Sequence, residues 1–247
     1  MVRIAHISDT HIRNLKFHKQ YKVAFDDMYS QLRELKPDYI VHCGDIAHRK
    51  TDISPELIDM TTDFIRSLAD IAPTHVILGN HDGNLRNDSR QDAISPIVAA
   101  MDNSNVFLYK KSGEFDIGDN IVLNVLSVFD KDNWLTQPSR SDKVNIALYH
   151  GSVAGCKTET GFMLEHGIDI SELENFDYAM LGDIHKTDQR LDHAGRVRYC
   201  GSTIQQNHGE TNDKGYLIWD IEDKNKFSVE HHQIKNINPF VTIILTP

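Results

Sequence analysis

Short apolar runs alternate with helical patterns in the first third of the chain, and this alternation limits the fold more than any other feature. Residues 2–7, 39–43 and 74–78 are apolar and strand-like. Residues 17–36 and 54–71, which separate them, carry apolar side chains at helical spacing. Strands joined by helices in this way form a parallel sheet with right-handed crossovers. The pattern predicts an α/β fold.

The ends of the two helices are marked in the sequence. Pro37 follows the first helix and Pro73 follows the second, and proline cannot continue a helix. Ser54 and Pro55 are typical of the residue that caps a helix and of its first turn.

The pattern changes after a third expected helix at 89–101. Short strand-like runs separated by turn residues then dominate, with a brief helical region at 159–175. The strand-like runs are 106–109, 114–117, 121–128, 145–149, 178–181, 189–193, 196–200, 215–220, 226–232 and 240–245. So many strands in one chain predict two sheets packed together, with helices outside.

Composition narrows the class of protein. With 247 residues, of which 40% are hydrophobic, the chain can form one full core. It has no apolar run of 18 residues that could span a membrane, and we expect a cytoplasmic protein. Cys43, Cys156 and Cys200 lie far apart, which argues against disulfides or a structural zinc site. A net charge of −10 disfavours nucleic-acid binding by charge alone.

Five of the apolar strands are followed at once by a polar loop. The side chains in these loops are Asp9, His11, Asp45, His48, Asn80, His81, Asp82, His150, Asp183 and His185. Ligands bind beyond the carboxyl ends of strands in α/β sheets, and mixed Asp, Asn and His donors suit manganese, iron or zinc better than calcium. Polar turns that only cap strands are the alternative for each loop alone, but five in succession favour a metal site.

Two metals about 3.5–4 Å apart need a carboxylate that bridges them, and such a pair activates phosphoryl displacement. Asp45 is the candidate bridge, because it follows the central strand.

These motifs together resemble those of the calcineurin-like metallophosphoesterases. The motifs are Asp9-x-His11, Gly44-Asp45, Gly79-Asn80-His81-Asp82, His150 and Gly182-Asp183-x-His185. Within that superfamily the chain most resembles the DNA double-strand-break repair nucleases called SbcD in bacteria. Three features carry this: His48 three residues after Asp45, Asp82 at the end of the third motif, and Tyr199-Cys200-Gly201-Ser202 followed by Gly209-Glu210.

The resemblance implies a four-layer α/β/β/α sandwich of two mixed sheets that binds two divalent metal ions. Manganese is the expected metal, with magnesium or iron as alternatives. The implied ligands of one metal are Asp9, His11, Asp45 and His185, and those of the other are Asp45, Asn80, His150 and Asp183. It further implies that a metal-bound water attacks the phosphorus. His81 would stabilise the transition state or protonate the leaving oxygen, Asp82 would orient His81, and His48 would assist near the phosphate.

The chain departs from the family in two respects. Asp183 stands where the family usually has histidine, so we expect manganese or magnesium to be favoured over zinc, with loss of the second metal as the alternative. Residues 1–247 match the catalytic core, and we expect the DNA-contacting cap domain and the segment that binds an SMC-like ATPase to be absent from this chain. Implied partners are DNA, an ATPase subunit of the SbcC type and a second copy of the chain.

Basic residues follow the metal loops closely. They are Arg13, Lys16, Arg49, Lys50, Arg86 and Lys186. They could hold a DNA backbone near the metals, or they could be ordinary solvated charges.

The predicted function is a two-metal DNA phosphodiesterase with exonuclease and endonuclease activity. The alternatives are a phosphodiesterase or phosphatase for small substrates and a catalytically weak metal-binding scaffold for the ATPase. Retention of His48, His81 and Asp82 argues against the scaffold.

Overall fold

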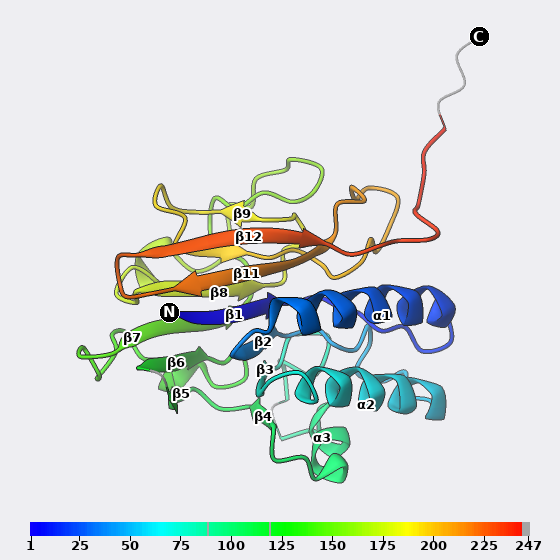
Figure 1. The fold of residues 1–247 in the computed structure, drawn as a ribbon, viewed down its shortest axis with the longest axis horizontal. Coiled ribbons are helices and arrows are strands. Elements are labelled where there is room, and N and C mark those ends of the chain that lie inside the picture. The colour runs from blue at the N-terminus through cyan, green and yellow to red at the C-terminus, as the bar shows by residue number, and fades with distance from the viewer. Residues whose placement is uncertain (88, 119, 244–247) are drawn as a thin grey trace.

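The computed structural model describes residues 1–87, 89–118 and 120–243 (Figure 1). Its helices are α1 (His18–Leu35), α2 (Pro55–Ala69) and α3 (Ser95–Met101), with the short 3-10 helices η1 (Lys131–Asn133) and η2 (Ile170–Glu172). Its strands are β1 (Val2–Ile7), β2 (Tyr39–Cys43), β3 (Thr74–Ile77), β4 (Val106–Tyr109), β5 (Gly113–Gly118), β6 (Ile121–Leu126), β7 (Val144–His150), β8 (Tyr178–Gly182), β9 (Gln189–Arg190), β10 (Val197–Tyr199), β11 (Gly215–Ile221) and β12 (Phe227–Gln233).

Within these residues the strands form two six-stranded sheets. The first has the order β12-β11-β1-β2-β3-β4, and the second has the order β5-β6-β7-β8-β10-β9. In the first sheet β1 to β4 are parallel, β11 pairs antiparallel with β1, and β12 pairs antiparallel with β11. In the second, β6, β7, β8 and β10 are parallel, and the edge strands β5 and β9 are antiparallel. Both sheets are therefore mixed, as the family resemblance implied.

Three apolar layers hold the molecule together. The layer between the sheets includes Ile4, Val41, Leu148 and Trp219. A second layer joins the first sheet to α1, α2 and α3, which lie on one side of the molecule in Figure 1. A third covers the outer face of the second sheet with loops and η2. The expected α/β class is confirmed, and the outermost layer over the second sheet is built from loops and 3-10 turns.

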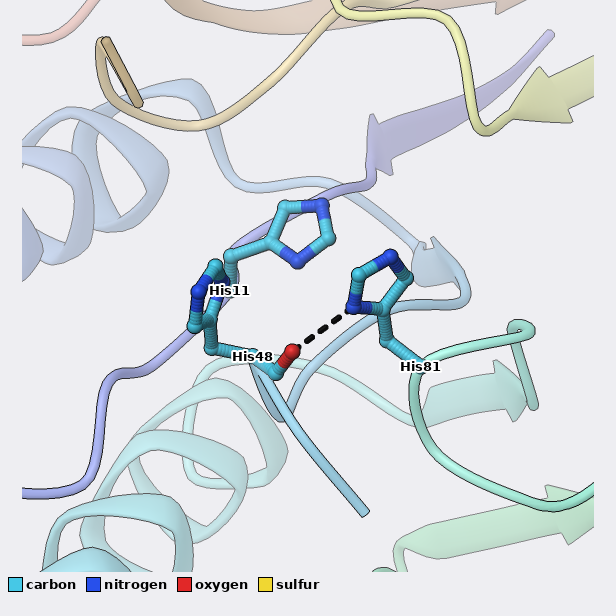
Figure 2. A group of neighbouring side chains, drawn as sticks. All are labelled: His11, His48 and His81. Atoms are coloured by element: carbon cyan, nitrogen blue, oxygen red, sulfur yellow. Dashed lines mark hydrogen bonds between the residues drawn. The ribbon is translucent and has the colours of Figure 1, made fainter. Parts of the chain in front are cut away.

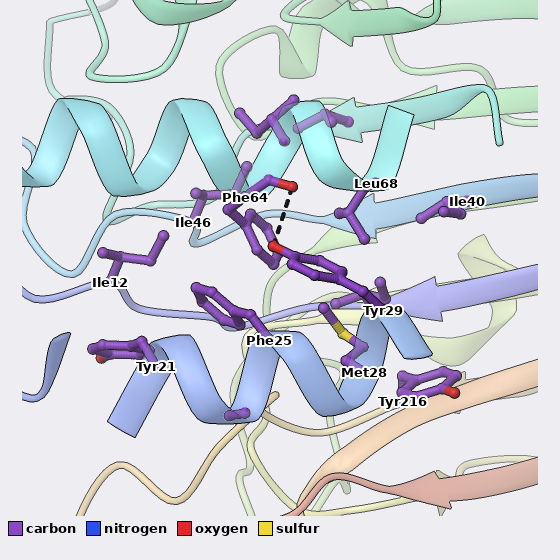
Figure 3. Packing of buried hydrophobic residues seen from close by; sticks show 14 of the residues in the cluster. Ile12, Tyr21, Phe25, Met28, Tyr29, Ile40, Ile46, Phe64, Leu68 and Tyr216 are labelled. Atoms are coloured by element: carbon purple, nitrogen blue, oxygen red, sulfur yellow. Dashed lines mark hydrogen bonds between the residues drawn. The ribbon is translucent and has the colours of Figure 1, made fainter. Parts of the chain in front are cut away.

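Helices α1 and α2 end where the sequence predicted. The Ser54 hydroxyl accepts the backbone N–H of Leu57 at 3.2 Å, which caps α2. Lys36 ends α1 in a left-handed conformation with φ of 51°. Phe25 of α1 and Phe64 of α2 pack with ring centroids 4.6 Å apart (Figure 3). Ile12 and Ile46, from the first two polar loops, are buried in the same cluster, so packing against the helices holds those loops in place.

The helices expected at 89–101 and 159–175 differ from the observed structure. The 89–101 region is helical only from Ser95, because the Asp92 carboxylate accepts the backbone N–H groups of Ile94 and Ser95 and starts the helix there. The 159–175 prediction is wrong except for the 3-10 turn η2. Gly161, with φ of 83°, instead makes a tight turn within a short hairpin.

The last expected strand, 240–245, is not formed by residues 240–243, and residues 244 and 245 lie outside the described residues. Phe240 exchanges two hydrogen bonds with the side chain of Gln205 in place of strand pairing.

All three cysteines are buried and free, in agreement with the argument against disulfides. In the described ranges, none of the helices has the length and apolar character that crossing a lipid bilayer requires.

Candidate metal centre

The polar loops after β1 and β2 are joined by a short backbone ladder. The Asp9 N–H donates to the Gly44 carbonyl at 3.0 Å, and the His11 N–H donates to the Asp45 carbonyl at 2.9 Å. Asp9, His11 and Asp45 have φ values of 52°, 48° and 58°, and Asp183 has 95°. This left-handed region is costly for residues other than glycine and is typical of functional sites. The strain turns the four side chains toward one point.

Two glycines let the loops approach that point. A Cβ added at Gly79 would collide with Asp45 Oδ1 and lie 2.7 Å from the His150 ring. A Cβ at Gly182 would collide with the Ser8 hydroxyl and the Cys43 carbonyl. Any larger residue at these positions would push the polar side chains apart.

The first group of side chains is the one expected around one metal. His11 Nε2 lies 3.6 Å from Asp45 Oδ2 and 3.7 Å from Asp9 Oδ1. His185 Nε2 lies 3.7 Å from the same Asp9 oxygen and 3.0 Å from His11 Nε2. Four donor atoms from three separate strand ends thus face one another.

The second group shares Asp45 with the first. His150 Nε2 lies 3.3 Å from Asp45 Oδ2 and 3.8 Å from Asp183 Oδ1. Asp45 Oδ2 is therefore within 3.6 Å of a histidine nitrogen of each group. This is the position that a bridging carboxylate needs. Asn80, expected in this group, precedes His81 in the third loop, and the His81 N–H donates to Asp45 Oδ1 at 2.8 Å.

Hydrogen bonds select the tautomer of two of the histidines. His150 Nδ1 lies 2.6 Å from the Cys43 carbonyl, and His185 Nδ1 lies 2.8 Å from Glu210 Oε1. Because neither oxygen carries a proton to donate, each Nδ1 donates the hydrogen bond, and each Nε2 is the nitrogen that faces the cluster. This is the arrangement in which a histidine ligates a metal, which takes the place of the Nε2 proton while an outer partner holds the second nitrogen.

The residues present fit a metal centre. His150 Nε2 and Asn80 Oδ1 are buried and have no hydrogen-bond partner within the part of the chain that the structure describes. A buried polar atom without a partner is costly, and a cation would satisfy both. Two ligand sets, Asp9 with His11 and His185, and Asp9 with Asp45 and His150, hold their donor atoms within 4.8 Å of one another.

The charges in the cluster are strongly coupled. Burial lowers the pKa of His150, but the carboxylates of Asp45, Asp9 and Asp183 overcome this and raise it well above its usual value. Burial raises the pKa of Asp9, but the surrounding histidines outweigh burial and lower it. The carboxylates of Asp9, Asp45 and Asp183 therefore favour positive charge in this space.

Asp82 has a different role from the one expected. Its carboxylate accepts the backbone N–H groups of Asp45 at 2.8 Å, Ala47 at 2.9 Å and Gly79 at 2.9 Å, and it is fully buried. Burial and the charge of Asp45 raise the pKa of Asp82 to about 7, while the N–H groups of Gly79 and Ala47 oppose this. Asp82 therefore ties the second and third loops together and does not orient the His81 ring.

The His81 ring is oriented by His48 instead. His81 Nδ1 donates to the His48 carbonyl at 2.7 Å, and the rings of His11, His48 and His81 gather in Figure 2. The His11 and His81 ring centroids are 4.9 Å apart. Burial and the neighbouring cations lower the pKa of His48 to about 4, so its ring is neutral at pH 7. Both expected catalytic histidines thus lie beside the ligand cluster.

Most of the candidate DNA-binding residues line two pockets beside these histidines. One pocket, of about 280 Å³, is lined by Arg13, Asn14, Leu15, Lys16, His48, Arg49 and Asp52. The other, of about 480 Å³, is lined by Arg49, Lys50, Thr51, Asn80, His81, Asn84, Leu85 and Arg86. Lys186 is in neither lining.

The sequence missed the role of Glu210. This carboxylate is buried and receives the His185 ring, the backbone N–H of Gln206 and the side-chain amide of Asn207. Its pair with Gly209 was visible in the sequence, but no spacing rule places it beside His185. Tyr21 of α1 was also missed as a support, and its hydroxyl donates to the His11 carbonyl at 2.5 Å.

Comparison with known proteins identifies the family. The model of the calcineurin-like phosphoesterase family matches residues 2–187. The chain belongs to this family. The resemblance drawn from the motifs is thereby confirmed, and the chain is assigned to a family of metal-dependent phosphoesterases.

Several relatives are longer than this chain. Uncharacterized protein R555 of Acanthamoeba polyphaga mimivirus is 40% identical, over 92% of this chain and 18% of its own length. The DNA double-strand break repair protein Mre11 of Halobacterium salinarum is 24% identical, over 88% of this chain and 56% of its own length. Exonuclease subunit 1 of Enterobacteria phage T4 is 23% identical, over 74% of this chain and 52% of its own length. The chain thus spans about half or less of the length of these relatives.

A dimetal phosphatase from Danio rerio has the same fold. Its structure matches with a TM-score of 0.53 at 12% identity, over 93% of this chain and 98% of the phosphatase chain.

Proposed function

We propose that the chain is a two-metal phosphodiesterase that cleaves DNA. The observation that carries this proposal is the continuity of two basic pockets with the ligand cluster. His48 lines one pocket and His81 lines the other, and Arg49 borders both. A phosphodiester at the cluster would extend on either side toward these cations, as a polynucleotide backbone does and a small phosphate ester does not.

Two divalent ions held by the cluster would supply Lewis-acid activation of water and would neutralise the phosphodiester charge. The ligands of one ion would be Asp9, His11, Asp45 and His185. Those of the other would be Asp45, Asn80, His150 and Asp183.

The protein's own contribution to the reaction lies in His81 and His48. Because His81 Nδ1 is committed to the His48 carbonyl, only Nε2 remains to exchange a proton with the substrate. A doubly protonated ring would donate there to the leaving oxygen or to a charged phosphoryl oxygen. His48, neutral at pH 7, would donate or accept a hydrogen bond at the phosphate without adding charge.

Two of the relatives support a nucleic-acid substrate. One is named as a DNA double-strand break repair protein and another as an exonuclease subunit.

The experiment compares linear DNA with bis-p-nitrophenyl phosphate in the presence of manganese. We expect the 247-residue chain to cleave both, and His81→Ala to lose turnover on both by about 10²-fold or more. Hydrolysis of only the small ester would favour the small-substrate phosphodiesterase instead. Turnover that is unchanged in His81→Ala would remove His81 from the chemistry.

Manganese or magnesium is the proposed metal. The second ligand set holds three oxygen donors, from Asp45, Asn80 and Asp183, and one nitrogen donor from His150. Oxygen-rich sets favour harder ions over zinc. Chelation followed by metal add-back tests this, and recovery of activity with zinc but not with manganese would contradict it.

An SMC-like ATPase partner and a homodimer remain part of the proposal. The phage T4 relative is named as a subunit, which supports an assembly. Sedimentation of the chain alone, and its co-purification with a co-expressed ATPase, would test the two associations separately.

A further inference from the structure

The pocket beside His81 gathers positive charge. It has a volume of about 480 Å³, and Arg49, Lys50 and Arg86 line it together with Asn80 and His81. Its other lining residues, Thr51, Asn84 and Leu85, are uncharged. Because no acidic side chain is among the described lining residues, the pocket favours an anion.

Lys50 joins this pocket to the metal cluster. Its ammonium donates to the backbone carbonyl of Asn80 at 3.1 Å, and the Asn80 side chain is a proposed ligand of the second metal. The carbonyl carries no net charge, so this hydrogen bond holds the ammonium in place without neutralising it. Lys50 forms no ion pair in the part of the chain that the structure describes, and its remaining N–H groups are available to an anion.

The two arginines of the pocket differ in how far their charge is compensated. The Arg49 guanidinium pairs with the Asp52 carboxylate at 3.3 Å on the surface. The Arg86 side chain has no acidic partner among the described residues, and its backbone N–H donates to the side-chain oxygen of Asn84 at 3.0 Å. Lys50 and Arg86 are therefore the two cations of this pocket whose charge is not compensated within those residues.

The pocket beside His48 offers less free positive charge. Its charged lining residues are Arg13, Lys16, Arg49 and Asp52. Asp52 thus contributes a carboxylate to this lining, and the Arg13 guanidinium already donates to the Gln206 carbonyl at 3.0 Å. The stronger site for an anion is on the His81 side of the metal cluster.

The place of His81 indicates which anion this pocket would receive. His81 lines the pocket and is the residue proposed to protonate the leaving oxygen. The strand that departs with this oxygen would therefore run into the pocket. Since the metal ions would hold the scissile phosphate itself, the anion that reaches Lys50 and Arg86 would be the next phosphate along the leaving strand.

We propose that Lys50 and Arg86 bind the phosphate next to the scissile phosphodiester on the leaving strand. This inference rests on the proposed nuclease function. It makes the preferred substrate a chain with at least two successive phosphates, rather than an ester with a single phosphate. Charge-assisted hydrogen bonds from the ammonium and the guanidinium to phosphate oxygens would supply this preference.

The test uses two octathymidylates in which uncharged methylphosphonates replace most of the phosphodiesters. One keeps a single phosphodiester in the middle, and the other keeps two adjacent phosphodiesters. The kcat/KM of the manganese-loaded chain is measured for each bond from the lengths of the products. In the second oligonucleotide, the bond whose leaving strand carries the other phosphate should be cleaved about 10–100-fold faster than the single phosphodiester. The gain should shrink as salt is added, because salt screens exposed charges.

The variants assign the gain to particular side chains. Lys50→Met should lose most of it, Arg86→Met should reduce it, and Lys50→Arg, which keeps the charge, should retain most of it. The matched control is Lys224→Met, on the turn between β11 and β12. The Lys224 side chain is 36% exposed and pairs with Asp177 at 3.1 Å, and its removal should leave the full gain.

The outcomes separate this proposal from the nuclease function. No gain from the second phosphodiester would overturn the phosphate site alone. So would failure to cleave either modified oligonucleotide while ordinary octathymidylate is cleaved. A full gain in the double variant of Lys50→Met and Arg86→Met would also overturn it, because the phosphate would then be bound elsewhere. If wild type cleaves no oligonucleotide but still hydrolyses the small ester, the nuclease function fails and this proposal fails with it.

Discussion

Replacing Asp82 by asparagine should destabilise the fold itself. The Asp82 carboxylate is fully buried and accepts three backbone N–H groups, from Asp45, Ala47 and Gly79. The asparagine oxygen can keep two of these when it takes the place of Oδ2. Its NH₂ group then faces the Ala47 N–H, so two donors oppose each other.

The magnitude follows from these three contacts. A buried N–H left without its acceptor costs about 1–3 kcal/mol. The charge lost from the other two bonds adds little, because burial and Asp45 already disfavour the charged form of Asp82 and raise its pKa to about 7. For a chain of this length, about 2–4 °C in melting temperature corresponds to each kcal/mol, so Asp82→Asn should melt roughly 2–12 °C below wild type.

Thermal unfolding in EDTA is the assay, because removal of metal separates loop stability from metal binding. Asp63→Asn is the matched control. Its carboxylate is 67% exposed and pairs with Arg66 at 3.5 Å on the surface, so the change should stay within about 0.5 kcal/mol. If Asp82→Asn has the melting temperature of wild type yet loses catalysis, Asp82 acts on His81, and its role in joining the loops is refuted.

Three further predictions concern the centre and its surroundings. Glu210→Gln should weaken metal binding by about 10–100-fold in calorimetry, since the ring of His185 loses its carboxylate partner, and unchanged affinity would contradict this. Asp183→His should shift the preference in competitive metal binding from manganese toward zinc, whereas an unchanged order would show that Asp183 does not set it. Burial raises the pKa of Asp92, but hydrogen bonds from Ser95 and the Lys110 ammonium outweigh burial and lower it. The stabilisation is therefore present above the ordinary aspartate pKa of about 4 and is lost as pH falls below it. Asp92→Asn should unfold about 1–2 kcal/mol more easily at pH 7, and this difference should shrink in denaturant titrations at lower pH.

The convergence of the proposed ligands could be predicted because strand ends in a parallel sheet meet at one edge. Asp9, Asp45 and His150 each follow or end an apolar strand, so their convergence required only the order of strands. The proposal of Asp45 as a bridge followed in the same way, and its carboxylate lies near histidines of both groups.

The supports of the site could not be predicted by the same reasoning. Glu210 lies on a long connection, and nothing in its spacing places it beside His185. Asp82 follows His81 along the chain, which favoured a contact between them, but the backbone turns the carboxylate back into the loops. The 157–163 hairpin was mistaken for helix because its apolar residues are spaced as in a helix, while the left-handed φ of Gly161 was not visible.

The proposed centre is a pair of metals bridged by Asp45. Electron paramagnetic resonance of the chain titrated with manganese, together with metal analysis, tests this in one measurement. We predict two ions per chain with an exchange-coupled signal, and loss of the coupling in Asp45→Asn. One ion per chain, or two uncoupled ions in the wild type, would contradict the two-metal centre.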